Sequence, residues 1–366
     1  MNNLKSIRNS VLFLMLLISI SCSTGNNDTP RQKIKFDYGW SFSKGEFTDA
    51  YKNDFDDKEW KSLDLPHDWS ITDTFSKKNP GSCAYATGGI GWYRKKFNTD
   101  NISKDSKVSI EFGGVYMNSE VWINGHYLGK RPYGYISFNY DLTPYLDYKG
   151  ENVLAVKVDK SKQPSARWYT GSGIYRHVWL AVTEKLHVAR HGIHAVAGYD
   201  SNKDADVRIT TQIENEYDKN QGFTLQNDIY AADGTLVVSE KTADNLDPET
   251  SKKISQNLKF KNPELWSPAS PYLYTLRTKI MQGDKMIDSI DTRIGIRNIK
   301  FTREKGFFLN GVNMKILGVN NHSDLGALGA ALNEKVLIRR LKILKDMGCN
   351  AIRTAHNPPS EELLEL

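Results

Sequence analysis

The chain has 366 residues, which is too long for one ordinary sandwich domain and predicts two or three domains. Hydrophobic residues make up 39% and charged residues 25% of the sequence, a balance that excludes a disordered chain. The net charge of +6 is modest, and Lys and Arg are spread along the chain instead of forming a basic cluster. We therefore expect no nucleic-acid partner.

The N-terminus is typical of an export signal. An apolar run over residues 11–20 follows a basic start and is too short to cross a bilayer comfortably. Cys22 follows this run, which indicates either a lipoprotein signal, with the lipid on Cys22, or an ordinary cleaved signal peptide. We expect a signal over residues 1–22, a polar linker over 23–33, and a protein in the periplasm or on the cell surface. Its membrane contact would be limited to this lipid anchor.

Three cysteines do not make a disulfide framework. We expect Cys83 and Cys349 to be free thiols, with Cys349 buried. No CxxC spacing indicates a zinc site, and no metal or other cofactor is required by the sequence.

Residues 34–184 show the pattern of an all-β domain. Alternating runs over 108–112 and 152–158 predict strands, separated by turn-forming residues. Asn124-Gly125 between apolar runs predicts a hairpin with a type I′ turn. Many short strands at this spacing indicate a sandwich or jelly roll.

Residues 185–299 form a second all-β block. Strands are predicted over residues 206–214, 223–230, 253–260 and 272–280. About seven strands in roughly a hundred residues suit an immunoglobulin-like sandwich. The Cys-Trp-Cys signature of antibody domains is missing from this block.

The pattern changes to alternating strands and helices over residues 300–366. A strand is predicted over 312–320, then a helix that Asn333 caps and Gly348 ends. A second strand over 350–355 and a helix after Ser360 follow. This is the opening of a parallel α/β unit with about one and a half repeats, whereas a closed barrel needs eight. We expect the chain to end inside this domain.

Eight stretches in this order resemble glycoside hydrolase family 2, and most of all its bacterial β-galactosidases. The resemblance covers essentially all of the chain after the linker, and its last two motifs are the most specific. The stretches are 65–71 (LPHDWSI), 92–97 (WYRKKF), 112–129 (FGGVYMNSEVWINGHYLG), 171–180 (GSGIYRHVWL), 262–267 (NPELWS), 295–297 (GIR), 318–322 (GVNNH) and 348–359 (GCNAIRTAHNPP). The resemblance implies a jelly-roll sugar-binding domain, an immunoglobulin-like sandwich and a TIM barrel, the same order as the pattern predicts.

The resemblance also implies hydrolysis with retention of configuration by two glutamates, one as acid/base and one as nucleophile. In the family both lie on later barrel strands, so we expect them beyond Leu366 and expect the 366-residue chain itself to be inactive. Glu361, Glu362 and Glu365 do not match those positions. They lie in the first turns of a predicted helix, where acidic side chains complement the helix dipole.

Two histidines are the best candidates for a site. His322 and His356 each follow a predicted barrel strand at its carboxyl end, the face where TIM barrels build active sites. By resemblance, both match histidines that hydrogen-bond sugar hydroxyls. Arg353 matches the family's barrel arginine, and strand alternation lets it point into the barrel. Asn357 is a weaker candidate of the same loop.

Three jelly-roll residues complete the candidate set. Asp68 stands where lactose-cleaving relatives have an asparagine that contacts the sugar, and a turn-capping role is an equal alternative. Arg167 stands where those relatives have an acidic ligand of sodium and sugar, so we expect no sodium site here. Trp168 can stack on a sugar face or simply pack.

The leading functional hypothesis is an exo-acting β-galactosidase of carbohydrate metabolism, with a β-galactoside or related glycan as substrate. A β-glucuronidase or β-mannosidase of the same architecture is one alternative. A non-catalytic carbohydrate-binding remnant is another, and an exported structural module is a third. A magnesium ion is suggested by the resemblance alone, and a homo-oligomer is compatible with the sequence.

Overall fold

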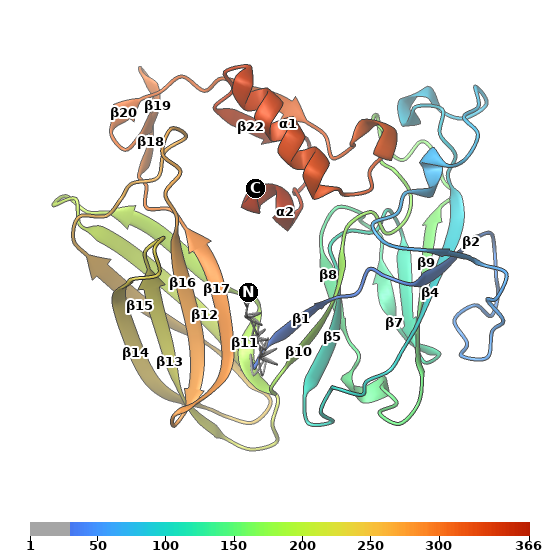
Figure 1. Cartoon of the computed structure of the whole chain (residues 1–366), viewed down its shortest axis with the longest axis horizontal. Helices are drawn as coiled ribbons and strands as arrows, with labels where there is room; N and C mark the ends of the chain where they lie inside the picture. The colour runs from blue at the N-terminus through green and yellow to red at the C-terminus, as the bar shows by residue number, and fades with distance from the viewer. Residues whose placement is uncertain (1–29) are drawn as a thin grey trace, which may run out of the picture.

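A computed structural model describes residues 30–366 (Figure 1). The predicted export signal and its Cys22 lie outside the described residues. Within residues 30–366, no helix is long and apolar enough to cross a membrane. Figure 1 shows two β-sandwiches side by side, with a small C-terminal α/β unit lying across one end of both.

The first sandwich is a jelly roll of two antiparallel sheets, with strand orders β3-β2-β4-β9-β6-β7 and β1-β10-β5-β8. Trp40, Ile110 and Leu154 are fully buried between the sheets. The predicted turn is confirmed, because Asn124 and Gly125 have φ values of 48° and 79°. The strands are β1 (Gln32–Lys35), β2 (Trp40–Lys44), β3 (Lys61–Leu63), β4 (Gly89–Phe97), β5 (Lys107–Phe112), β6 (Ser119–Ile123), β7 (His126–Arg131), β8 (Phe138–Asp141), β9 (Asn152–Lys160) and β10 (Val178–Thr183), with 3-10 helices η1 (Trp69–Ile71), η2 (Gly81–Cys83) and η3 (Thr143–Tyr145).

The second sandwich has the immunoglobulin-like architecture that the sequence predicts. Its two antiparallel sheets have the orders β11-β12-β15 and β14-β13-β16-β17. Alternate residues of each strand, such as Val207, Ile209 and Leu276, face the core between the sheets. The strands are β11 (Leu186–Tyr199), β12 (Ala205–Asn215), β13 (Gln221–Tyr230), β14 (Leu236–Leu246), β15 (Thr250–Phe260), β16 (Tyr274–Gln282) and β17 (Lys285–Ile294).

The C-terminal unit begins as a TIM barrel begins. A small antiparallel sheet comes first, and then β21 pairs in parallel with β22. As predicted, Asn333 caps α1, since its side chain accepts a hydrogen bond from the Val336 amide at 3.2 Å. The elements are β18 (Ile299–Thr302), β19 (Gly306–Leu309), β20 (Val312–Asn313), β21 (Gly318–Asn321), η4 (Gly326–Leu328), α1 (Glu334–Asp346), β22 (Ala351–Thr354) and α2 (Glu361–Glu365).

Two expectations about this unit were wrong. The single strand predicted over residues 312–320 is two strands, because β20 pairs with β19 whereas β21 pairs with β22. The second concerns burial of the free thiols. Cys83 is the buried one, inside the jelly roll, whereas Cys349 is only half-buried in the turn that leads to β22.

Charged side chains join the sandwiches to each other. The Lys107 ammonium on β5 donates to Asp141 at 3.0 Å and to Glu216 of the second sandwich at 2.5 Å. Arg31, one residue before β1, forms a two-point ion pair with the buried Asp288 on β17. Strand β1 starts at Gln32, two residues before the predicted start of the jelly roll. It lies between the two sandwiches (Figure 1).

Candidate functional site

The two predicted histidines meet at one edge of the C-terminal unit. His322 follows β21 directly, and His356 lies two residues after the end of β22. Because the strands are parallel, their carboxyl ends lie at the same edge. The two imidazole rings have centroids 5.2 Å apart and stand at 90° to each other.

Trp168 of the jelly roll completes this ring cluster, which we define as Trp168, His322 and His356. Its ring centroid lies 5.3 Å from that of His322 and 5.2 Å from that of His356. The indole N–H donates to the Tyr135 hydroxyl at 3.0 Å, and the two imidazole rings pack against the indole. Arg167 precedes it and is exposed. The cluster therefore combines side chains from two domains.

Two tyrosines that were not predicted as site residues support the cluster from the jelly roll. The Tyr133 hydroxyl donates to Asn357 Oδ1 at 2.5 Å, and Tyr133 as a whole residue is 47% exposed. This bond occupies the amide oxygen of Asn357 and leaves its NH2 group to point elsewhere. Burial raises the pKa of Tyr135 above its ordinary range, so its hydroxyl stays protonated. Both tyrosines lie in the turn-forming stretch 132–135 (PYGY), which is the sequence feature that could have pointed to them.

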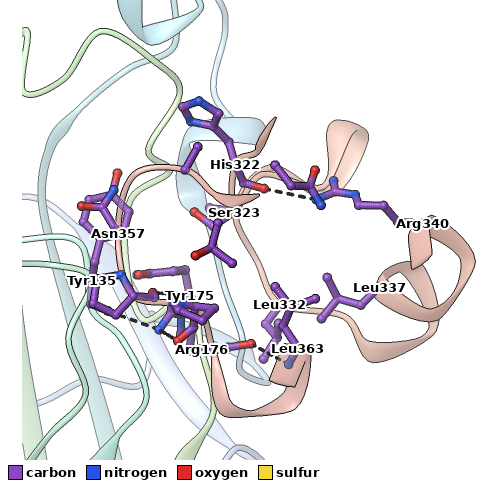
Figure 2. Close-up of a pocket in the computed structure, with 17 residues that line it drawn as sticks. Tyr135, Tyr175, Arg176, His322, Ser323, Leu332, Leu337, Arg340, Asn357 and Leu363 are labelled. Atoms are coloured by element: carbon purple, nitrogen blue, oxygen red, sulfur yellow. Dashed lines mark hydrogen bonds between the residues drawn. The ribbon is translucent and has the colours of Figure 1, made fainter. Parts of the chain in front are cut away.

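A small pocket opens beside the cluster (Figure 2). Tyr135, His322 and Asn357 line it, with Leu337 and Leu363 at its apolar end. No Asp or Glu is among its lining residues within the described chain. In particular, Glu361 and Glu365 of α2 pair elsewhere, with Lys33 and Arg293.

Two arginines hold the loops that bear the histidines. Arg176 is buried and donates to the carbonyls of Pro358 at 3.0 Å and Pro359 at 3.3 Å, which fixes the loop after β22 against the jelly roll. Arg340 of α1 donates to the carbonyl of His322 at 3.2 Å. His322 Nδ1 is buried and has no hydrogen-bond partner within residues 30–366.

Arg353 does not join the pocket in this structure. Its side chain is exposed, and Nη1 donates to Asn320 Oδ1 at 3.1 Å on the neighbouring strand. The two residues are register partners of the parallel pair, which explains the contact. No ion pair of Arg353 occurs within the described residues.

Asp68 is buried where the jelly roll meets the C-terminal unit, with 1% of its surface exposed. It caps η1, because Oδ1 accepts a hydrogen bond from the Ser70 amide at 3.0 Å. Three further donors reach the same carboxylate, from Ser172, Tyr169 and Ala330. Of the two roles expected from the sequence, this geometry matches the turn cap.

One group of side chains has the composition of a metal site, and it lies elsewhere. His187, Glu214 and Glu216 offer ligand atoms within 4.8 Å of one another at the junction of the sandwiches. The Lys107 ammonium already contacts Glu216 there, so the local negative charge is partly neutralised. We therefore assign no metal to it.

Three family models match successive parts of the chain. They are the sugar-binding domain of glycosyl hydrolases family 2 over residues 56–184, the family 2 domain over 187–297, and the family 2 TIM barrel domain over 300–366. The matched ranges correspond to the jelly roll, the immunoglobulin-like sandwich and the C-terminal unit.

Curated relatives span the same region. The chain is 45% identical to β-galactosidase BoGH2A of Bacteroides ovatus over 348 residues, covering 94% of the chain and 41% of that protein. It is 39% identical to a putative β-glucuronidase of Formosa agariphila, covering 98% of the chain and 34% of that protein. The chain thus spans less than half the length of these relatives.

Solved structures agree with this assignment. A β-glycosidase from Bacteroides vulgatus matches with a TM-score of 0.85 and 41% identity, over 91% of the chain and 43% of that structure. A β-glucuronidase from glycoside hydrolase family 2 matches with a TM-score of 0.87 and 30% identity, over 92% of the chain and 38% of that structure. With its three domain types in the family's order, the chain belongs to glycoside hydrolase family 2.

Proposed function

We propose that this chain supplies the substrate-binding side of the active site of a retaining β-galactosidase. The observation that carries the proposal is the ring cluster, in which two histidines from barrel strand ends meet a tryptophan from the jelly roll. Imidazole nitrogens can donate to and accept from sugar hydroxyls, and an indole face can pack against the apolar face of a sugar ring. The relative with 45% identity is a β-galactosidase, which favours this substrate.

The reaction needs two carboxyl groups about 5 Å apart, one to protonate the leaving oxygen and one to attack the anomeric carbon. No carboxylate lines the pocket within residues 30–366. In our proposal the pair comes from later barrel strands, and the histidines orient the sugar between them. Their hydrogen bonds accelerate the reaction only to the extent that they strengthen in the transition state.

A β-glucuronidase is the second candidate, because relatives at 39% and 31% identity carry that name. A glucuronide brings a carboxylate that needs a cationic partner. Arg167 is exposed and directly precedes Trp168 in the chain, and its guanidinium is our candidate for that partner.

Hydrolysis of nitrophenyl β-galactoside, β-glucuronide and β-mannoside tests these proposals. We expect no turnover from the 366-residue chain, and turnover of the galactoside from a form with a complete eight-stranded barrel. In that form, His356→Ala should lower kcat and kcat/KM alike, and His191→Ala, an exposed histidine of the second sandwich, should change neither. Preference for the glucuronide would overturn the galactoside assignment, and an inverted anomer seen by NMR would overturn the retaining mechanism.

We further propose that the protein is exported and anchored by a lipid on Cys22. Wild-type protein should then sediment with membranes, and Cys22→Ala should release it. Recovery of the wild type wholly in the soluble fraction would contradict this proposal.

A further inference from the structure

Four hydrogen-bond donors from three separate segments converge on the Asp68 carboxylate. Oδ1 accepts from the backbone amides of Ser70 at 3.0 Å and Ser172 at 2.8 Å. Oδ2 accepts from the Tyr169 hydroxyl at 2.5 Å and from the Ala330 amide at 2.9 Å. Ala330 belongs to the C-terminal unit, so one carboxylate joins the jelly roll to the loop between β21 and α1.

The surrounding backbone is shaped to admit this carboxylate. A Cβ atom on Gly171 would lie 2.7 Å from Asp68 Oδ2, and a Cβ on Gly329 would overlap the same oxygen. Both glycines also have positive φ, at 70° and 61°. Close approach from both sides of the domain interface therefore depends on the lack of a side chain at these two positions.

The segments that Asp68 joins are the ones that carry the ring cluster. Tyr169 follows Trp168 directly, and Ala330 lies in the loop that begins with His322. Burial, and then the nearby Asp68 charge, raise the pKa of Tyr169, so its hydroxyl remains a donor to the carboxylate. With 1% of its surface exposed and both oxygens occupied, Asp68 has no free acceptor to offer a sugar.

We propose that Asp68 is a positioning residue, which holds the Trp168 loop of the jelly roll and the His322 loop of the barrel in register so that the ring cluster can form. The relevance to sugar binding rests on the proposed function, but the positioning role can be tested without any sugar. Failure of one proposal is thus distinguishable from failure of the other.

Asp68→Asn separates the link between the domains from the links within the jelly roll. An amide keeps one acceptor oxygen, which best serves the two backbone donors, Ser70 and Ser172. Its NH2 group then faces Tyr169 and Ala330. The tyrosine hydroxyl can rotate and accept, but the Ala330 amide can only donate, so its hydrogen bond is lost.

Amide hydrogen exchange, measured residue by residue in the full chain, reports directly on the hydrogen bond from Ala330 to Asp68. In Asp68→Asn, we expect the Ala330 amide to exchange at least tenfold faster and the Ser172 amide to keep its protection. Asp64→Asn is the matched control, since Asp64 is exposed and, within residues 30–366, its side chain accepts only from the Gly39 amide at 2.9 Å. This control should leave both amides unchanged.

The fluorescence of Trp168 distinguishes positioning from stabilisation. If Asp68 only stabilised the fold, the exposure of Trp168 to a quencher would not change. The Trp168 contribution is obtained by difference from Trp168→Phe, in the wild-type and in the Asp68→Asn background. We expect its acrylamide quenching constant to rise at least twofold in Asp68→Asn. Identical Ala330 exchange and Trp168 quenching in Asp68→Asn and Asp64→Asn would overturn the proposal.

Gly329→Ala keeps the test decisive if Asp68→Asn fails to fold. Its Cβ pushes against the carboxylate from the barrel side and leaves the jelly-roll sequence intact. The same increase in Trp168 quenching is expected, and an unchanged value would overturn the proposal.

Discussion

The ion pair between Arg31 and Asp288 predicts a measurable coupling between the start of the jelly roll and the second sandwich. Asp288 is fully buried, whereas the Arg31 side chain is 20% exposed. The carboxylate accepts from Arg31 Nε and Nη2, both at 2.8 Å, and from the Val188 amide at 2.7 Å. Arg31 Nη2 also donates to the Val188 carbonyl at 2.6 Å. The two side chains and one residue of β11 therefore form a closed set of hydrogen bonds.

The cost of Asp288→Ala follows from what it leaves unpaired. The buried Val188 amide loses the Asp288 carboxylate as its acceptor, which costs about 1–3 kcal/mol. Arg31 loses its counter-charge, but its exposure lets water replace part of that interaction, so the cost stays below the roughly 3–5 kcal/mol typical of a fully buried pair. We expect the free energy of unfolding to fall by about 3 kcal/mol in total. Arg31→Ala leaves a buried carboxylate with one backbone donor and should cost about 2 kcal/mol.

A double-mutant cycle in urea unfolding of the full chain tests this account. The double variant should cost about 3 kcal/mol instead of the sum of the singles, which gives a coupling energy of about 2 kcal/mol. The control pair is Arg277 and Asp291, which meet at 2.7 Å but are 41% and 48% exposed. Their coupling should stay below about 1 kcal/mol. Single-variant costs at Arg31 and Asp288 that add within about 0.5 kcal/mol would refute the reasoning.

Three further changes should have defined effects. Burial, followed by the nearby Lys61 charge, lowers the pKa of His67 to about 4, below its ordinary value of 6.5. The unfolded chain then binds the proton first, so stability should be complete above pH 6.5 and fall by up to about 3 kcal/mol as the pH drops towards 4. A midpoint series in urea from pH 7 to 4 measures this, and an equally steep loss in His67→Gln would contradict it. Asn333→Ala removes the cap of α1 and should cost about 1 kcal/mol, read as lower helical protection in hydrogen exchange; no loss there would argue against the capping bond. Gly173→Ala places a Cβ 2.9 Å from the His67 carbonyl at a φ of 117°, so a drop in Tm equivalent to more than about 2 kcal/mol is expected, and a neutral Tm would show that the loop can yield.

Features fixed by neighbours in the chain could be predicted from the sequence. The Asn124-Gly125 turn and the Asn333 cap depend on a few adjacent residues, and both occur as expected. The meeting of His322 and His356 could also be predicted, because parallel strands place their carboxyl ends at one edge. The single strand predicted over residues 312–320 was wrong, because two short strands there pair with different partners. The pattern of apolar residues shows no break between these strands.

Contacts between distant segments could not be predicted in this way. The bond from Ala330 to Asp68 joins residues 262 positions apart, and that from Tyr133 to Asn357 joins residues 224 apart. From the sequence, Asp68 offers a sugar contact and a turn cap as equal alternatives, because an acceptor before a short helical turn suits both. Only the folded structure, in which three jelly-roll donors and one donor of the C-terminal unit meet, shows that its oxygens are already used.

The division of labour between the domains follows from the same contacts. The C-terminal unit provides the two imidazoles, but the jelly roll provides Trp168, which contacts both of them. Arg176 and Asp68 reach from the jelly roll to backbone atoms of the two barrel loops, at Pro358 and at Ala330. Both contacts end on backbone atoms of the loops, so apart from Gly329, where a Cβ would overlap the Asp68 carboxylate, they place few limits on the loop side chains. The jelly roll therefore fixes where the two barrel loops lie, and in the proposed function their other side chains are left to contact the sugar.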